Sequence, residues 1–184
     1  GVGRSQLPKM LDDRPYLKSF HHGPTWSATK VLLLSNVVLF VLQQILVFYT
    51  SLPIETYFYL SKEGIARGFV FQLVTYQFLH AGVWHLLGNL LVIYFMGKAL
   101  EEVLGTKDFL MLYFTSGLVG GVFQIGLAWM APHLFGGYVV GASAAAFGLV
   151  ASFAQMFPDR VMTLLLFFVI PFSIRAQTLL WIAI

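Results

Sequence analysis

The feature that most constrains this chain is a run of twenty residues, 31–50, without a single charged side chain. As a helix that rises about 1.5 Å per residue, such a run reaches roughly 30 Å, the thickness of the hydrocarbon core of a bilayer. More apolar runs follow, so that 58% of the residues are hydrophobic and only 10% are charged, against about 25% charged in soluble domains. The sequence therefore predicts an all-α, polytopic membrane helix bundle.

The apolar runs and the helix-stop residues between them place the spanning helices. We expect them at 31–50, from about 73 to 104, at 109–130 and at 141–157. The second ends where Gly105 can adopt the left-handed conformation that closes a helix, and the fourth ends before Pro158. Residues 51–72 mix charges with aromatic rings, which is typical of an amphipathic segment at the membrane interface.

The last part of the chain is less regular. Residues 161–170 are too few to cross a bilayer and are expected to form a shallow or re-entrant segment. A fifth span is expected to begin near Ala176 and to be cut off at Ile184.

Small residues indicate how the third and fourth spans pack. Gly117 and Gly121 are four residues apart, as are Ala144, Gly148 and Ser152. Stripes of this kind let helix backbones approach closely in a membrane. We expect the third and fourth helices to pack tightly.

The cations predict the orientation. Five lie in the tail, at Arg4, Lys9, Arg14, Lys18 and Lys30, and the same side receives Lys98, Lys107, Arg160 and Arg175, which makes nine against Lys62 and Arg67. Cytoplasmic loops are enriched in Lys and Arg. Residues 1–30 are thus expected to be a cytoplasmic tail and residues 31–184 a membrane domain, in a bacterial inner membrane. A basic patch for nucleic acid is not indicated.

This orientation brings three polar residues to a similar depth below the outer face, because the second and fourth spans both begin there. His85 and Asn89 share one helix face, since a step of four residues turns only about 40° past a full circle. Ser143 begins the fourth span among small residues. A step of five turns about 140°, so His80 is expected to point elsewhere, and a metal held by both histidines is disfavoured unless the helix begins between them. Taken singly, His85 and Asn89 are explained by hydrogen bonding between helices, and Ser143 is explained as a small residue at a helix contact or as an N-cap.

Together these residues resemble the rhomboid family of intramembrane serine proteases. The family pattern H-x-x-x-x-H-x-x-x-N matches His80, His85 and Asn89, and its G-x-S pattern matches Gly141 and Ser143. The flanking stretches FQLVTYQFLH and GKALEEVLG, the latter with Glu101, are similar to the family's entry into and exit from the second helix. The resemblance covers roughly residues 30–184.

The resemblance implies a serine endopeptidase that cuts transmembrane segments of other membrane proteins near the outer face. Ser143 would be the nucleophile, and His85 and Asn89 would help to form the oxyanion hole with the amide of Ser143. His80 and Gly141 would support the site, and the ring of Phe147, on the same face as Ser143, would lie beside the family's catalytic histidine. The implied partners are membrane-protein substrates and the lipid bilayer, and no metal, nucleotide or organic cofactor is indicated.

Two departures from the family pattern stand out. Ala144 replaces the usual glycine after the nucleophile, which puts a methyl group beside the oxyanion site. The family's general base is a histidine on the sixth helix, and no histidine follows His133. His133 lies in the loop between the third and fourth spans and is not assigned as the base. We therefore expect a fragment whose missing base lies beyond Ile184.

Two other functions are compatible with the same residues. One is a rhomboid-like pseudoprotease, which binds membrane segments without cutting them. The other is a small transporter or channel, with Gln43 and Gln44 lining a polar path together with His85 and Asn89. The lack of an inverted repeat between the two halves of the chain argues against transport.

Overall fold

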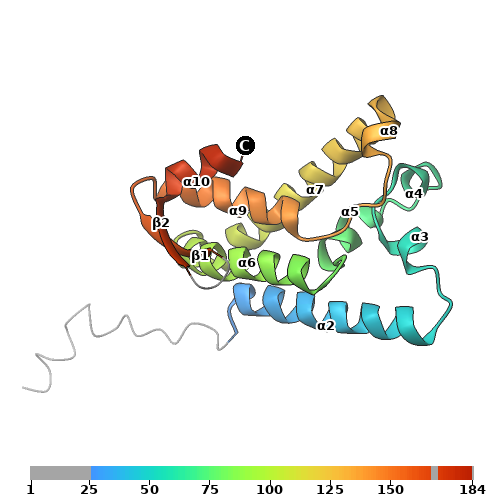
Figure 1. Ribbon diagram of the computed structural model, residues 1–184, viewed down its shortest axis with the longest axis horizontal. Coiled ribbons are helices and arrows are strands. Elements are labelled where there is room, and N and C mark those ends of the chain that lie inside the picture. Colours follow the sequence, from blue (N-terminus) through green and yellow to red (C-terminus); the bar gives the residue numbers. More distant parts are fainter. Residues whose placement is uncertain (1–25, 167–169, 184) are drawn as a thin grey trace, which may run out of the picture.

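The computed structural model describes residues 26–166 and 170–183, so most of the expected tail lies outside the described residues. Long helices dominate this part of the chain (Figure 1). Three of them are long and apolar enough to cross a membrane, namely α2 (Ala28–Tyr49), α6 (Val83–Leu104) and α7 (Thr106–Met130). A fourth, α9 (Ser143–Met156), is apolar but has only 14 residues. The protein is an integral membrane protein with the expected helix-bundle fold.

The chain between α2 and α6 forms short helices. They are α3 (Ile54–Phe58), α4 (Lys62–Ala66), α5 (Gln72–Thr75) and the 3-10 turn η2 (Tyr76–Phe78). Together with α8 (Pro132–Phe135), the helices α3 and α4 lie at one end of the bundle, on the right of Figure 1.

The second long helix begins later than expected. It starts at Val83 instead of near residue 73, because the backbone is extended at Leu79 and at Gly82, where φ is 178°. The segment 79–82 therefore separates η2 from α6 and leaves His80 outside the helix. The other end of α6 is as expected, since Gly105 follows Leu104 with a φ of 79°.

The first helix begins three residues before the expected span, because Glu101 holds its N-terminus. The Glu101 carboxylate accepts hydrogen bonds from the backbone N–H of Ala28 (2.7 Å) and of Thr29 (2.9 Å). It also accepts from the hydroxyls of Thr29 (2.7 Å) and Thr106 (3.0 Å). Ser27 caps the same helix by accepting from the N–H of Lys30. One carboxylate thus ties the start of α2 to the junction of α6 and α7.

Residues 161–170, expected to form a shallow or re-entrant segment, contribute to two strands, and residues 167–169 lie outside the described residues. The strand β1 (Val161–Leu166) pairs antiparallel with β2 (Ile170–Arg175), with Val161 opposite Arg175 and Leu166 opposite Ile170. A hairpin lets each strand satisfy the backbone groups of the other, which a ten-residue apolar run cannot do in an extended form alone. The next helix, α10 (Ala176–Ala183), begins at the expected residue.

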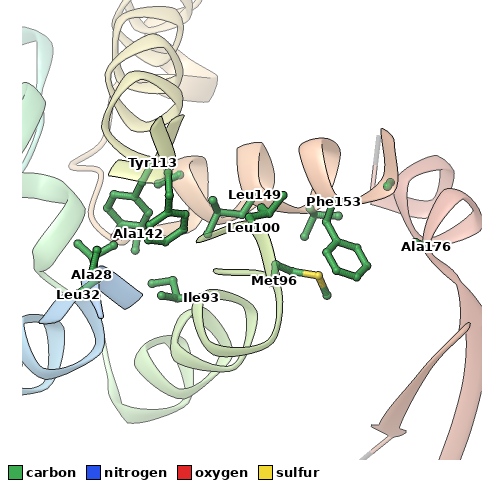
Figure 2. Close-up of a cluster of buried hydrophobic side chains, with 14 residues drawn as sticks. Ala28, Leu32, Ile93, Met96, Leu100, Tyr113, Ala142, Leu149, Phe153 and Ala176 are labelled. Carbon is green, nitrogen blue, oxygen red and sulfur yellow. The ribbon is translucent and has the colours of Figure 1, made fainter. Parts of the chain in front are cut away.

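The apolar core joins the long helices near the end of the bundle where α2 begins. Figure 2 shows Ala28 and Leu32 of α2 close to Ile93 of α6, with Leu149 and Phe153 of α9 farther along the cluster. Leu100 of α6 and Tyr113 of α7 belong to the same cluster and are fully buried. Residues from all four helices thus form one core.

The helices α7 and α9 pack tightly, with the expected stripe on α9 but with a different glycine of α7 from the expected ones. A Cβ on Gly120 would lie 2.6 Å from the Cβ of Ala144, and a Cβ on Gly148 would collide with the side chain of Ser116. The expected stripe on α9 therefore does contact α7, where it meets Ser116 and Gly120.

The stripe of Gly117 and Gly121 faces the short helices instead. A Cβ on Gly117 would collide with the Gln77 side chain, and one on Gly121 would lie 3.1 Å from the Tyr76 ring. Tyr76 also donates a hydrogen bond from its hydroxyl to the carbonyl of Gly117 (2.6 Å). The sequence could not distinguish these two faces of α7, because both carry small residues.

Candidate active site

Ser143 is the first residue of α9, where a helix leaves its backbone N–H groups without partners inside the helix. The turn before it depends on Gly141, whose φ of 116° lies in a region that residues with a Cβ rarely adopt. The N–H of Gly141 donates to the carbonyl of Tyr76 (2.9 Å), which fixes the turn against η2. The hydroxyl and the amide of Ser143 are therefore presented at a fixed helix start.

The imidazole of His85 lies directly against Gly141. A Cβ added to Gly141 would lie 2.6 Å from Nε2 of His85 and 3.4 Å from Nδ2 of Asn89. No side chain larger than hydrogen fits there without displacing the imidazole. Two features of the structure thus require glycine at position 141, the positive φ and the close approach of His85.

Asn89 and Ser143 line one cavity of about 190 Å³, together with Phe147 and small or apolar residues of α6 and α9. Asn89 is 7% exposed, and its amide nitrogen has no hydrogen-bond partner among the residues that the structure describes. An unpaired buried donor costs free energy unless a ligand or water accepts from it. The ring of Phe147 lines the same cavity and is 56% exposed.

His80 lies beside His85, which corrects the expectation that it points elsewhere. Because α6 begins between the two histidines, the five-residue step is not helical, and the ring centroids are 5.3 Å apart in a T-shaped arrangement. His80 is fully buried, and neither ring nitrogen makes a well-formed hydrogen bond within residues 26–166 and 170–183. Burial, and to a smaller extent the nearby His85, lowers the pKa of His80 to about 4. His80 is therefore neutral at pH 7 and is a poor general base.

Gln43 of α2 holds the backbone of His80 and was not expected among the site residues. Its side-chain amide accepts from the N–H of His80 (3.0 Å) and donates to the carbonyl of His80 (2.9 Å). It also lies 2.9 Å from the hydroxyl of Tyr59. The extended segment 79–82 lacks helical hydrogen bonds, so Gln43 supplies partners that a membrane interior does not. The sequence signal for this role of Gln43 was its place as a polar residue in the apolar run 31–50.

A backbone bridge holds the chain that leads to Ser143. Leu60 and Val139 exchange two N–H to carbonyl hydrogen bonds of 3.0 and 2.9 Å. The rings of Tyr59 and Tyr138 lie next to this bridge with their centroids 6.2 Å apart. The interfacial segment before α4 therefore anchors the approach to the G-x-S turn.

The two departures from the family pattern also have definite places. The methyl group of Ala144 points towards Gly120 of α7, and Ala144 is not among the residues that line the cavity. His133 is exposed on α8 and does not line it either. Within residues 26–166 and 170–183, no group of three or more histidine, aspartate or glutamate side chains is placed to hold a metal ion.

The structure thus brings Ser143, Asn89, His85 and Gly141 together, with His80 behind His85. Chemically this set offers one hydroxyl at a helix start, the Asn89 amide in the same cavity and the His85 imidazole against the preceding turn. Such groups can stabilise negative charge that develops on an oxygen atom next to the hydroxyl.

Comparison with known proteins relates most of this chain to rhomboid proteins. The family model for the rhomboid domain matches residues 67–184. Rhomboid protein 1, mitochondrial, of Saccharomyces cerevisiae is 29% identical over 174 residues, which are 90% of this chain and 49% of that protein. The putative rhomboid protease YdcA of Bacillus subtilis is 42% identical over 94 residues, 50% of this chain and 44% of that protein.

One of the relatives that match this chain is named as inactive. Inactive RHOMBOID-like protein 8 of Arabidopsis thaliana is 30% identical over 83 residues, 45% of this chain and 22% of that protein. The chain spans about half the length of the first two relatives. Because the family model covers well over half of the chain, this protein belongs to the rhomboid family.

Proposed function

We propose that this chain carries the nucleophile and the oxyanion-binding groups of an intramembrane serine endopeptidase. The observation that carries the proposal is the meeting of Ser143 and Asn89 in one cavity, with His85 pressed against Gly141. The resemblance of His80, His85, Asn89, Gly141 and Ser143 to the family pattern supports it, as do relatives that are named proteases.

The proposed reaction is acyl transfer to Ser143. The hydroxyl oxygen attacks a substrate peptide carbonyl carbon while a base takes its proton, and the carbonyl oxygen becomes an oxyanion. His85, Asn89 and the N–H of Ser143 donate hydrogen bonds to that oxyanion. The amine leaves with a proton, and water then hydrolyses the acyl-enzyme. Loss of one such donor typically raises the barrier by roughly 3 to 4 kcal/mol.

The base in this proposal is the histidine that the family carries on a further helix. His80 does not fit the role, because its buried ring has a pKa of about 4. His85 is assigned to the oxyanion, since its imidazole lies against Gly141, two residues before Ser143. His133 does not line the cavity.

The proposed substrates are other membrane proteins, cut near the outer end of a spanning helix. A helix shields its peptide carbonyls by internal hydrogen bonds, so the substrate helix must locally unwind before Ser143 can attack. The outer location follows from the charge distribution, with the cations of the chain concentrated at the opposite end.

A fluorophosphonate probe, which reacts with activated serines, tests this proposal on the full-length protein in detergent. Labelling of the wild type, its loss in Ser143→Ala and its retention in Ser152→Ala are expected. Ser152 lies on the same helix and does not line the cavity, so it is a matched control. Labelling that persists in Ser143→Ala would exclude Ser143 as the nucleophile.

The pseudoprotease is the second candidate, and the relative named inactive favours it. In that case the full-length protein would bind a transmembrane peptide but would not react with the probe. A transport path is less well supported. The Gln43 amide is already bonded to the backbone of His80, and its neighbour Gln44 is exposed on the outer surface of α2.

A further inference from the structure

Two adjoining cavities lie at the end of the bundle where α2 begins, far along α6 from Ser143. One, of about 340 Å³, lies between the start of α2 and the last turns of α6. The other, of about 520 Å³, lies between α6 and the C-terminal end of α9. Both are lined by Tyr94, Lys98 and Glu102, which are four residues apart on α6, and the two cavities together are called the groove below.

Cations line this groove at both ends and in the middle. Lys30 lies in the first cavity, Arg160 in the second, and Lys98 in both. None of the three forms an ion pair within residues 26–166 and 170–183. The positive-inside rule explains why cations lie on this side of the membrane. It does not explain why three of them converge on one groove.

The acidic side chains of the groove do not balance these cations. The carboxylate of Glu101 already accepts from two backbone N–H groups and two hydroxyls at the start of α2 and α7. Glu102 makes no hydrogen bond or ion pair in the described part of the chain, so the groove holds two carboxylates, one of them already hydrogen-bonded, against three cations. The groove therefore has an excess of positive charge.

Aromatic rings hold the Arg160 side chain in place. Its guanidinium carbon lies 5.5 Å from the centroid of Phe157 and 5.7 Å from that of Phe153. Stacking on rings leaves the in-plane N–H groups of a guanidinium free, and their forked geometry suits phosphate oxygens. Arg160 is thus oriented without a protein anion.

The wall of the groove is apolar towards the lipid. Phe95 is 58% exposed, Tyr94 49% and Val103 56%, and all three line the groove. Cations at one level and exposed aromatic and aliphatic side chains beside them match an amphiphile with an anionic head and an acyl chain. A free acidic peptide would match the charges but not the apolar wall.

We propose that this groove binds an anionic glycerophospholipid of the leaflet at the end of the bundle where α2 begins. The phosphate lies between Lys98 and Arg160, with Lys30 near the headgroup, and an acyl chain lies along Phe95 and Val103. This site is separate from the cavity at Ser143 and does not depend on the proposed proteolysis. Basic pockets between membrane helices are known to bind such headgroups.

The test measures phospholipid binding to the full-length, delipidated protein by native mass spectrometry. Phosphatidylglycerol is expected to bind more tightly than phosphatidylcholine with the same acyl chains. The double variant Lys98→Gln with Arg160→Gln is expected to lose at least about fivefold in phosphatidylglycerol affinity, the effect of about one cation near an anionic headgroup. Equal binding of the two lipids to the wild type would overturn the proposal.

A charge-matched control separates the groove from general attraction. Lys62→Gln with Lys107→Gln removes the same charge, and neither residue lines the groove. Less than a twofold loss is expected there, and equal losses in the two double variants would contradict the site. Glu102→Gln removes the free acid and is expected to tighten phosphatidylglycerol binding, a gain that misfolding cannot produce. Tighter binding of a soluble acidic peptide than of phosphatidylglycerol would also overturn the proposal.

Discussion

Replacing Glu101 by glutamine changes one atom and is expected to destabilise the whole bundle. In the wild type, Oε1 accepts from the N–H of Ala28 and the hydroxyl of Thr106, and Oε2 accepts from the N–H and the hydroxyl of Thr29. The amide group of glutamine has one acceptor oxygen, so its NH₂ must face donors. Both hydroxyls can rotate, but one of the two backbone N–H groups loses its partner.

The expected cost is the sum of two effects. A buried N–H without a partner costs about 1 to 3 kcal/mol. Loss of a negative charge at the start of α2 removes about 0.3 to 1 kcal/mol of favourable interaction with the helix dipole. We therefore expect Glu101→Gln to lower the free energy of unfolding by about 1 to 4 kcal/mol.

Unfolding by sodium dodecyl sulfate in lipid-free detergent, followed by far-ultraviolet circular dichroism, measures this loss. Glu102→Gln is the matched control, because the neighbouring carboxylate is exposed and makes no hydrogen bond in the described part of the chain. Its effect is expected to stay within about 0.5 kcal/mol. The reasoning is refuted if the two variants unfold at the same detergent fraction.

Three further predictions concern the site and the helix packing. Since burial lowers the pKa of His80 from 6.5 to about 4, folding carries no penalty from this group above pH 6.5. The penalty grows to at most about 3 kcal/mol as the pH falls to 4. In His80→Gln, the free energy of unfolding measured in detergent should therefore fall less between pH 6.5 and pH 4 than in the wild type. Gln43→Leu should destabilise the fold by about 2 to 4 kcal/mol, because the N–H and carbonyl of His80 lose their hydrogen-bond partner. Gln44→Leu should have no effect on stability. A loss of equal size in both variants would refute the role of Gln43 in holding the backbone of His80. Gly120→Ala should destabilise the protein because its Cβ has no room, whereas Gly126→Ala, which meets nothing within 4 Å, should leave the unfolding midpoint unchanged or slightly raised.

The helices were predictable where hydrocarbon length alone decides the structure. The runs that became α2 and α7, the stop at Gly105 and the start of α10 at Ala176 all follow from local sequence. The start of α6 did not, because the apolar residues 73–82 satisfy the composition of a span while their backbone takes partners from elsewhere. Gly141, for example, donates to Tyr76, and Gln43 bonds to His80.

The sequence predicted that the candidate residues would lie close together, but it did not predict their detailed geometry. His85, Asn89 and Ser143 were expected at a similar depth, and the structure brings them together at Gly141 and the adjoining cavity. The position of His80 was wrong because helical spacing was applied across a break in the helix. The sequence also could not predict which glycine of α7 contacts α9, because Gly117, Gly120 and Gly121 differ mainly in their direction around the helix axis.

The contact of His85 with Gly141 joins helices that are inserted at different times during synthesis. A nascent chain that has placed only α2, α6 and α7 in the membrane has the imidazole and the amide, but no glycine turn and no serine beside them. The pocket is completed only when α9 docks between its neighbours. In the proposed function, the reactivity of Ser143 therefore depends on the docking of α9.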